Sequence, residues 1–98
     1  MNFFRNNLHN TLEKFTKKFL SKIHYGNLEV TFPSGEKKVY SGINDDLTAS
    51  IVINNYNFLS YILKRGSVGY AEAYMQGFFS TPNLTDLLML SRKNEKFF

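Results

Sequence analysis

The first apolar pattern along the chain has the spacing of an α-helix. Near the start of the sequence, apolar residues recur every three or four positions, at Phe4, Leu8, Leu12, Phe15, Phe19 and Ile23. Residues with this spacing share one face of a helix. We therefore predict an amphipathic helix over residues 5–23, ended by Gly26. Its apolar stripe would either pack on a sheet or rest on a membrane.

The next segment changes to the two-residue period of a β-strand. Leu28, Val30 and Phe32 alternate with polar residues, and "PSGE" supplies the Pro and Gly of a turn before Val39 and Tyr40. This pattern predicts a hairpin. A polar link, "GINDD", follows it. The β-branched residues of "TASIVIN" then predict a third strand, more buried than the first two.

The remainder of the chain returns to helical spacing. One helix is predicted from about residue 55 to Gly66, and a second from Ser67 to Gly77. "FFST" predicts a brief edge strand, and Asn83 is placed to cap a last helix. Strands and helices in separate blocks predict an α+β fold. We expect a small antiparallel sheet, the hairpin plus a third strand, packed with about four helices.

The helical segments also predict which side chains form the core. The residues expected there are Tyr74, Met75 and Phe79, packed against Phe58, Leu59 and Ile62. The last helix is apolar on more than one side, which is typical of a helix buried on more than one side. We therefore predict that Leu84, Met89 and Leu90 contact a second subunit or another domain, with Met89 and Leu90 partly exposed in the isolated chain.

Composition excludes several classes of site. The 98 residues contain no cysteine, which excludes disulfides, thiolate catalysis and Cys-ligated zinc. Neither histidine belongs to a metal-binding spacing, so we predict no metal site. No apolar run approaches the roughly 20 residues of a membrane span. We predict one cytoplasmic domain without a cofactor.

The net charge of +4 arises in the first quarter of the chain. Residues 1–24 hold five basic residues and one acid, whereas bases and acids balance over the remaining residues. The lysines of this segment are Lys14, Lys17, Lys18 and Lys22. A basic amphipathic helix predicts docking on an anionic membrane surface, with Phe15 and Phe19 entering the lipid. The alternatives are a protein partner, nucleic acid, or an ordinary helix with solvated lysines.

One carboxylate stands inside an apolar run, "GYAEAYMQGFF" over residues 69–79. General acid–base catalysis by Glu72 would need a second carboxylate, a histidine or a metal, and none is near it in the sequence. The chain also has no phosphate-binding or nucleophile-elbow motif. We predict that Glu72 faces solvent or pairs with Lys64, Arg65 or a tyrosine hydroxyl, and that the chain alone is not an enzyme.

The segment "GSVGYAEAYMQGFFSTPNLTDLLMLSRKN" resembles the end of the N-terminal domain of the cyclopropane fatty acid synthases. The motif positions that carry this resemblance are Gly69, Glu72, Tyr74, Met75, Gly77 and Phe79, where Phe79 replaces the usual Trp. The upstream hairpin is similar to that family at Gly26, Leu28, Val30, Pro33, Gly35 and Gly42. The resemblance extends over residues 26–94.

The resemblance implies a division of labour. Residues 1–24 would be the basic helix, and residues 25–94 the lipid-associated N-terminal domain. The resemblance also implies a fold similar to that of sterol carrier proteins for this domain. In the full-length family, such a domain assists methylene transfer from S-adenosylmethionine to unsaturated acyl chains of phospholipids. No residue here matches the family's methyltransferase domain, so no catalytic or cofactor-binding residue is carried over. The implied partners are a phospholipid surface at the inner membrane and the methyltransferase domain or a second subunit, as in a homodimer. A remnant of a degraded synthase gene is the other interpretation.

Overall fold

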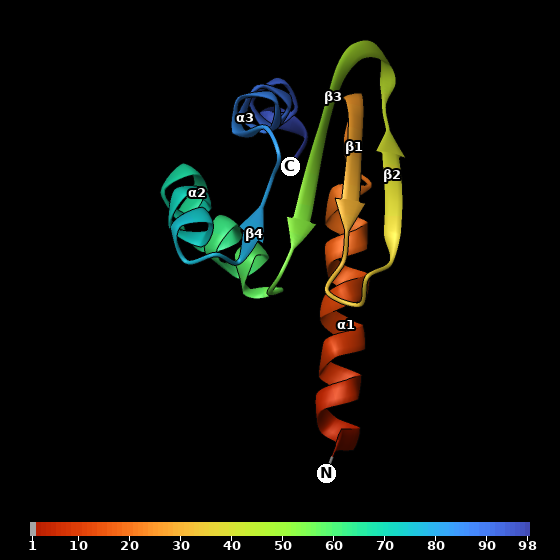
Figure 1. Cartoon of the computed structure of the whole chain (residues 1–98), viewed down its shortest axis with the longest axis vertical. Coiled ribbons are helices and arrows are strands. Elements are labelled where there is room, and N and C mark those ends of the chain that lie inside the picture. The colour runs from red at the N-terminus through yellow and green to blue at the C-terminus, as the bar shows by residue number, and fades with distance from the viewer. Residues whose placement is uncertain (1) are drawn as a thin grey trace.

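The computed structural model describes the backbone of residues 2–98 and the side chains of residues 11–43 and 47–98. Its elements in chain order are α1 (Asn2–Leu20), β1 (Tyr25–Thr31), β2 (Lys37–Ser41), β3 (Ile43–Ile53), α2 (Asn57–Met75), β4 (Phe79–Ser80), α3 (Leu84–Lys93) and a final 3-10 turn (Glu95–Phe97). In Figure 1, α1 runs behind β1 and extends below the sheet, while α2 and α3 lie beside β3. The fold is α+β, as the sequence predicts.

The four strands form one mixed sheet in the order β2-β1-β3-β4. β1 pairs antiparallel with β2, and β3 pairs antiparallel with β4, but β1 and β3 run parallel. The expectation of an antiparallel sheet was therefore wrong for the central pair. After β2, the chain crosses over the start of β1 and pairs on the other edge of that strand (Figure 1). Alternation predicts that a segment is a strand, but it does not indicate which edge the strand joins.

The third strand begins earlier than its apolar pattern indicates. The backbone N–H of Ile43 donates to the carbonyl of His24 at 2.6 Å, and that of Gly42 donates to Gly26 at 2.8 Å. In the segment "GINDD", which we predicted to be a link, β3 thus already begins at Ile43. The two backbone hydrogen bonds hold this start of the strand, and the hydrophobic pattern of a sequence does not report such bonds.

The helices cover one face of the sheet and leave the other open. Leu28, Tyr40 and Ala49 stand side by side on β1, β2 and β3, and all three are buried. Glu29 and Val39, one position further along, point to the opposite face and are exposed. Successive side chains of a strand alternate between faces, so this is the half-buried strand pattern that the sequence predicts.

Gly26 does not end the first helix, because α1 already ends at Leu20. It lies instead in β1, beside a register shift, with a φ of 77°. A Cβ atom at this position would lie 2.6 Å from Cδ1 of Leu90. The glycine is needed where α3 packs close against the start of β1, which is a long-range reason that local pattern analysis could not supply.

The helix α1 is also rotated relative to the prediction. Its buried side chains are Thr16 and Leu20, whereas Leu12 and Phe15 of the expected apolar stripe are exposed and Phe19 is half-buried. The Thr16 hydroxyl donates to the Leu12 carbonyl at 2.8 Å, so this polar side chain is buried without losing a hydrogen bond. Phe4 and Leu8, the other predicted members, lie outside the described side chains.

The helix α2 consists of two helical pieces that meet at Gly66. This residue has φ 57° and ψ −130°, which lies outside the helical region. The break confirms the predicted boundary between two helices, and Gly77 ends the second piece with a φ of 75°. The predicted edge strand is β4. Asn83 caps α3 as predicted, since its side-chain oxygen accepts from the N–H of Asp86 at 3.1 Å.

Only part of the predicted core is correct. Phe79, Phe58 and Leu59 are buried, but Tyr74 is 40% exposed and Met75 is 76% exposed. The second half of α2 turns its smallest residues inward: Gly69 and Ala73, four positions apart, are buried. The adjacent residues Tyr74 and Met75 therefore point toward the surface. Ile62 packs against the core while staying partly exposed.

The helix α3 buries one of the residues that we expected to remain exposed. Leu90 is only 2% exposed because it packs over Gly26 of β1, so that expectation was wrong. Met89 is 55% exposed, as predicted, and Leu84 is half-buried.

Candidate functional site

An apolar cleft of about 780 Å³ opens among α1, α2 and α3 on the covered side of the sheet. Leu28 and Ile51 of the sheet, both buried, belong to its lining. Phe19 and Ile23 line it on the side of α1. There the ring of Phe98 packs at a tilt against that of Phe19, with the two ring centres 4.8 Å apart. A cleft of this volume with mostly apolar walls is typical of a site for a small organic ligand.

The break in α2 shapes the opposite wall of the cleft. Gly66 and Ser67 line it at the break, and Tyr70, Ala71 and Tyr74 line it from the second half of α2. A straight helix would present a single face, whereas two pieces at an angle can surround a hollow. The predicted helix boundary at Gly66 thus acquires a role in the site.

A few polar groups interrupt the apolar lining. The Tyr70 hydroxyl lies 2.9 Å from the hydroxyl of Ser91, and burial raises the pKa of Tyr70, an effect that this hydrogen bond partly offsets. Arg92 and Glu95 line the cleft from exposed positions near the end of α3. These groups could orient the polar end of a ligand whose body is apolar.

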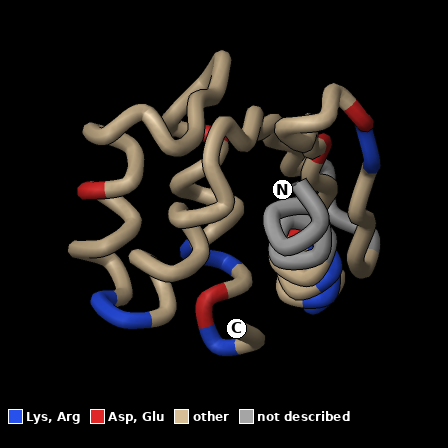
Figure 2. Tube along the Cα trace, turned by 90° about the horizontal axis from the view of Figure 1, so that it is seen from below, with Lys and Arg blue, Asp and Glu red and all other residues tan. Residues whose placement is uncertain are grey.

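Next to the cleft, α1 presents a basic surface, which we define as Lys14, Lys18 and Lys22 together with Phe15. All four side chains are exposed, and Phe15 keeps 59% of its surface. Phe15 and Lys18 are three positions apart on α1, so they share a face of the helix. Lys22 follows in the turn after Leu20, where α1 ends. Figure 2 shows Lys and Arg positions of α1, α2 and the C-terminal segment toward the lower side of that view.

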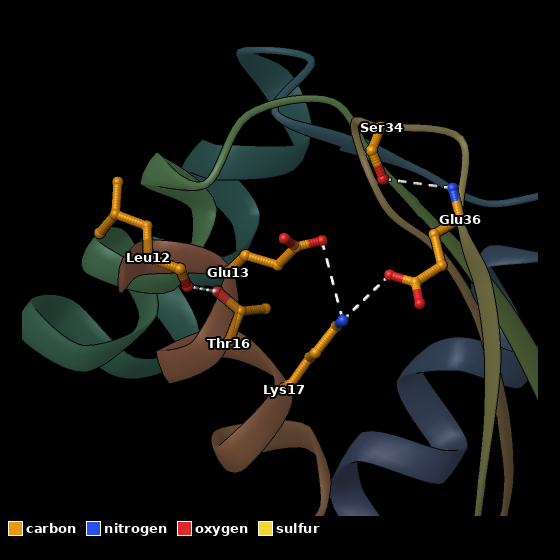
Figure 3. Close-up of polar contacts among 6 residues, drawn as sticks. All are labelled: Leu12, Glu13, Thr16, Lys17, Ser34 and Glu36. Carbon is orange, nitrogen blue, oxygen red and sulfur yellow. Dashed lines mark hydrogen bonds and ion pairs between the residues drawn. The ribbon is translucent and has the colours of Figure 1, made fainter. Parts of the chain in front are cut away.

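Lys17 does not belong to this basic surface, although the sequence grouped it there. Its Nζ lies 2.9 Å from Oε1 of Glu36 in the hairpin turn and 3.9 Å from Oε1 of Glu13 (Figure 3). The hydrogen bond to Glu36 raises the pKa of Lys17. The same ammonium stands 5.2 Å from the ring centre of Phe32. Lys17 therefore ties α1 to the hairpin.

Among known protein families, one described as "Domain of unknown function (DUF7884)" matches residues 15–98. The chain belongs to this family. The match begins at Phe15 and therefore includes every residue of the cleft and most of the basic surface. No curated protein and no solved structure matches the chain.

Glu72 of this DUF7884 domain is held in an ion pair, as predicted. Its Oε1 and Oε2 lie 2.7 and 2.8 Å from Nη1 of Arg65. Because Arg65 precedes the break at Gly66 and Glu72 follows it, the pair joins the two halves of α2. Among the described residues, no cluster of three His, Asp or Glu side chains could hold a metal ion.

The remaining motif residues of the DUF7884 domain are placed by packing. A Cβ at Gly69 would lie 1.9 Å from the carbonyl oxygen of Tyr61, so the two halves of α2 touch backbone to backbone there. Tyr74 packs its ring 5.5 Å from that of Phe79 and also lines the cleft, whose rim includes Met75. The "EAYM" stretch therefore contributes to the cleft as well as to the core.

Sequence reasoning missed the role of Asn94, a buried polar residue at the end of α3. Its Oδ1 accepts from the backbone N–H groups of His24 and Tyr25 at 2.7 and 2.8 Å. Its Nδ2 donates to the carbonyls of Tyr25 and Leu90 at 3.0 and 2.9 Å. Asn94 thus fixes α3 against the start of β1. The available signal was an asparagine directly after an apolar helix.

In the described part of the chain, no helix has both the length and the apolar character that crossing a membrane requires.

Proposed function

We propose that this DUF7884 domain is a non-catalytic module that associates with anionic lipid surfaces. The observation that carries the proposal is the exposed Phe15 on the same face of α1 as Lys18, with the exposed Lys22 in the turn that follows the helix. An exposed aromatic ring among lysines suits the boundary between headgroups and acyl chains, because the ring enters the apolar layer while the lysines contact phosphates. In a protein that also carried a methyltransferase domain, such a module would assist methylene transfer to phospholipid acyl chains.

The size of the electrostatic contribution is sufficient for reversible association. Each lysine near an anionic membrane surface contributes up to about 1 kcal/mol, and this contribution falls within a Debye length of the surface. Lys14, Lys18 and Lys22 together therefore contribute at most about 3 kcal/mol, to which burial of the Phe15 ring adds. Association should be moderate and should weaken with added salt.

Vesicle co-sedimentation of the full chain tests this proposal. We expect pelleting with vesicles of phosphatidylglycerol, much less with phosphatidylcholine, and a decrease as salt is raised. Lys18→Glu and Phe15→Ser should each weaken pelleting. Lys37→Glu is the matched control, because Lys37 is exposed on β2 two positions before Val39, on the open face of the sheet. Equal pelleting with both lipids, or an equal loss in Lys37→Glu, would contradict the proposal.

Lys17→Glu separates the two roles of the lysines. It breaks the contact with Glu36, so it should loosen α1 from the hairpin, which hydrogen exchange of the α1 amides would report.

Salt-dependent retention of an oligonucleotide on a gel, without vesicle pelleting, would instead favour nucleic acid as the partner of the basic surface.

A further inference from the structure

The rim of the cleft exposes more apolar surface than the core requires. Leu63, Met75 and Leu88 are exposed by 59%, 76% and 47%, and each also lines the cleft. Phe98 at the α1 side is 44% exposed. Contiguous exposed apolar surface around a hollow is typical of a binding site for an apolar group.

The volume of the cleft limits what can enter it. A methylene group fills roughly 30 Å³, about the share of one water molecule in the liquid, so an acyl chain of about 16 carbons fills roughly 500 Å³. The cleft of about 780 Å³ therefore accommodates one such chain but not two.

The position of the cleft beside the basic surface indicates the charge of the ligand. Phe15 and Phe19 are four positions apart on one face of α1. Phe15 is exposed, whereas Phe19 lies in the cleft wall together with Ile23, which comes after the end of the helix. At the α3 side, the exposed Arg92 stands in the lining. A guanidinium binds phosphate oxygens through two parallel hydrogen bonds. Glu95, the acidic residue of the lining, is exposed and could turn to solvent.

We propose that the cleft takes one acyl chain of an anionic phospholipid, with Arg92 at the mouth contacting the phosphate. This inference rests on the proposed association with lipid surfaces, which would bring the cleft to its ligand. The basic surface then holds the domain on the bilayer, while the cleft draws a single chain out of the leaflet. The hydroxyls of Tyr70 and Ser91 interrupt the apolar wall, and one of them donates a hydrogen bond to the ester carbonyl of the lipid.

Calorimetric titration of the full chain, without vesicles, tests the ligand class. The probe is myristoyl lysophosphatidylglycerol below its critical micelle concentration, because it has one chain and an anionic phosphate. We expect saturable binding, weaker binding of myristoyl lysophosphatidylcholine, and none of glycerophosphoglycerol, which lacks the chain. Tighter binding of free myristate would overturn the phospholipid assignment, and absence of saturable binding to any of them would overturn the proposal.

Two variants locate the ligand. Ala71→Trp fills the cleft from an exposed helical position and should weaken binding by about tenfold or more, equivalent to about 1.4 kcal/mol. Val68→Trp is the matched control, since Val68 is exposed on the same helix but lies outside the lining, and it should bind as the parent does. Equal losses in both variants would overturn the assignment to the cleft. Arg92→Gln should weaken the binding of lysophosphatidylglycerol by about three- to tenfold, as expected for an exposed charged contact. It should leave the binding of myristyl alcohol, which has no phosphate, unchanged.

The same variants distinguish this inference from the proposed function. Lys18→Glu should lose vesicle pelleting yet keep lysophosphatidylglycerol binding, whereas Ala71→Trp should keep pelleting and lose that binding. If Ala71→Trp retains both, the cleft proposal fails while the membrane proposal stands. Dimerisation of the chain on concentration, blocked by Ala71→Trp, would instead assign the cleft to a second copy and overturn the lipid inference.

Discussion

At the scale of single residues, Asn94 and Tyr40 show two opposite situations for a buried polar group. Asn94 is 1% exposed and makes four hydrogen bonds, which satisfy both ends of its amide. Tyr40 is 6% exposed, and its hydroxyl has no hydrogen-bond partner among the described residues. Removing a partner from a buried hydrogen bond leaves the other group unpaired, whereas removing an unpaired group leaves nothing behind.

The first prediction follows from this contrast. Asn94→Ala should lower the free energy of unfolding by about 3 kcal/mol, since buried backbone groups of β1 lose their partner. Tyr40→Phe should change it by less than about 0.5 kcal/mol, because the ring and its packing remain. Urea unfolding followed by circular dichroism measures both. A larger loss in Tyr40→Phe than in Asn94→Ala would show that the connection between α3 and β1 is not made by Asn94.

At the scale of elements, the break in α2 decides how the second half of that helix packs. The break needs Gly66, whose φ of 57° is unfavourable for other residues, and the close approach of Gly69 to Tyr61. The ion pair of Arg65 and Glu72 spans the break. The three features together orient the cleft wall.

The second prediction compares two glycines of this segment. Gly69→Ala would put a methyl group onto the Tyr61 carbonyl, so the two halves of α2 must move apart, at a cost of about 3 kcal/mol or more. Gly77→Ala meets no atom within 4 Å and pays only for its φ of 75°, about 1 kcal/mol. Thermal unfolding of the two variants gives the comparison. Equal shifts of the unfolding temperature in the two variants would contradict the close backbone contact at Gly69.

The sequence predicted the elements much better than their relations. Leu28, Val30 and Phe32 were correctly assigned to a half-buried strand because the two-residue period is a local property. The same is true of the helix boundaries at Gly66 and Gly77. The parallel pairing of β1 with β3 and the burial of Leu90 depend on segments far apart in the chain. Local periodicity contains no information about them.

The candidate site was predictable to a similar degree. The charge count located the basic helix, but the structure separates the roles of its lysines. Lys17 pairs with Glu36, whereas Lys18 makes no ion pair among the described side chains. The cleft was not predicted, because the sequence pattern placed Tyr74 and Met75 in the core. A hollow depends on how helices meet, and this is set by contacts such as that of Gly69 with Tyr61.

At the scale of the whole molecule, the buried tyrosines govern the response to alkaline pH. Burial, together with the charge and the hydrogen bond of Glu13, raises the pKa of Tyr56 to about 12. Burial also raises the pKa values of Tyr40 and Tyr70. A group with a raised pKa in the folded state gives its full contribution below the unfolded value, which is 10.0 for tyrosine, and loses it as the pH rises toward the folded value.

The third prediction is therefore a loss of stability on the alkaline side. Between about pH 9 and about pH 12, the free energy of unfolding should decrease, with Tyr56 accounting for up to about 2 kcal/mol of the loss. Tyr56→Phe should flatten the pH dependence, although its own stability at neutral pH should be lower by about 1 kcal/mol for the lost hydrogen bond to Glu13. Urea midpoints across the alkaline range measure both effects. An unchanged pH dependence in Tyr56→Phe would contradict the assignment.

The contacts of Asn94 also have a consequence for the order in which the polypeptide folds. They join residues 69 and 70 positions apart, which are among the longest separations that a chain of this length allows. During synthesis, the hairpin of β1 and β2 can form as soon as its residues leave the ribosome, because its contacts are local. The start of β1 stays unlocked until residue 94 has emerged. The domain therefore stays incomplete until α3 has been synthesised, and the sheet residues that α3 covers stay exposed until then.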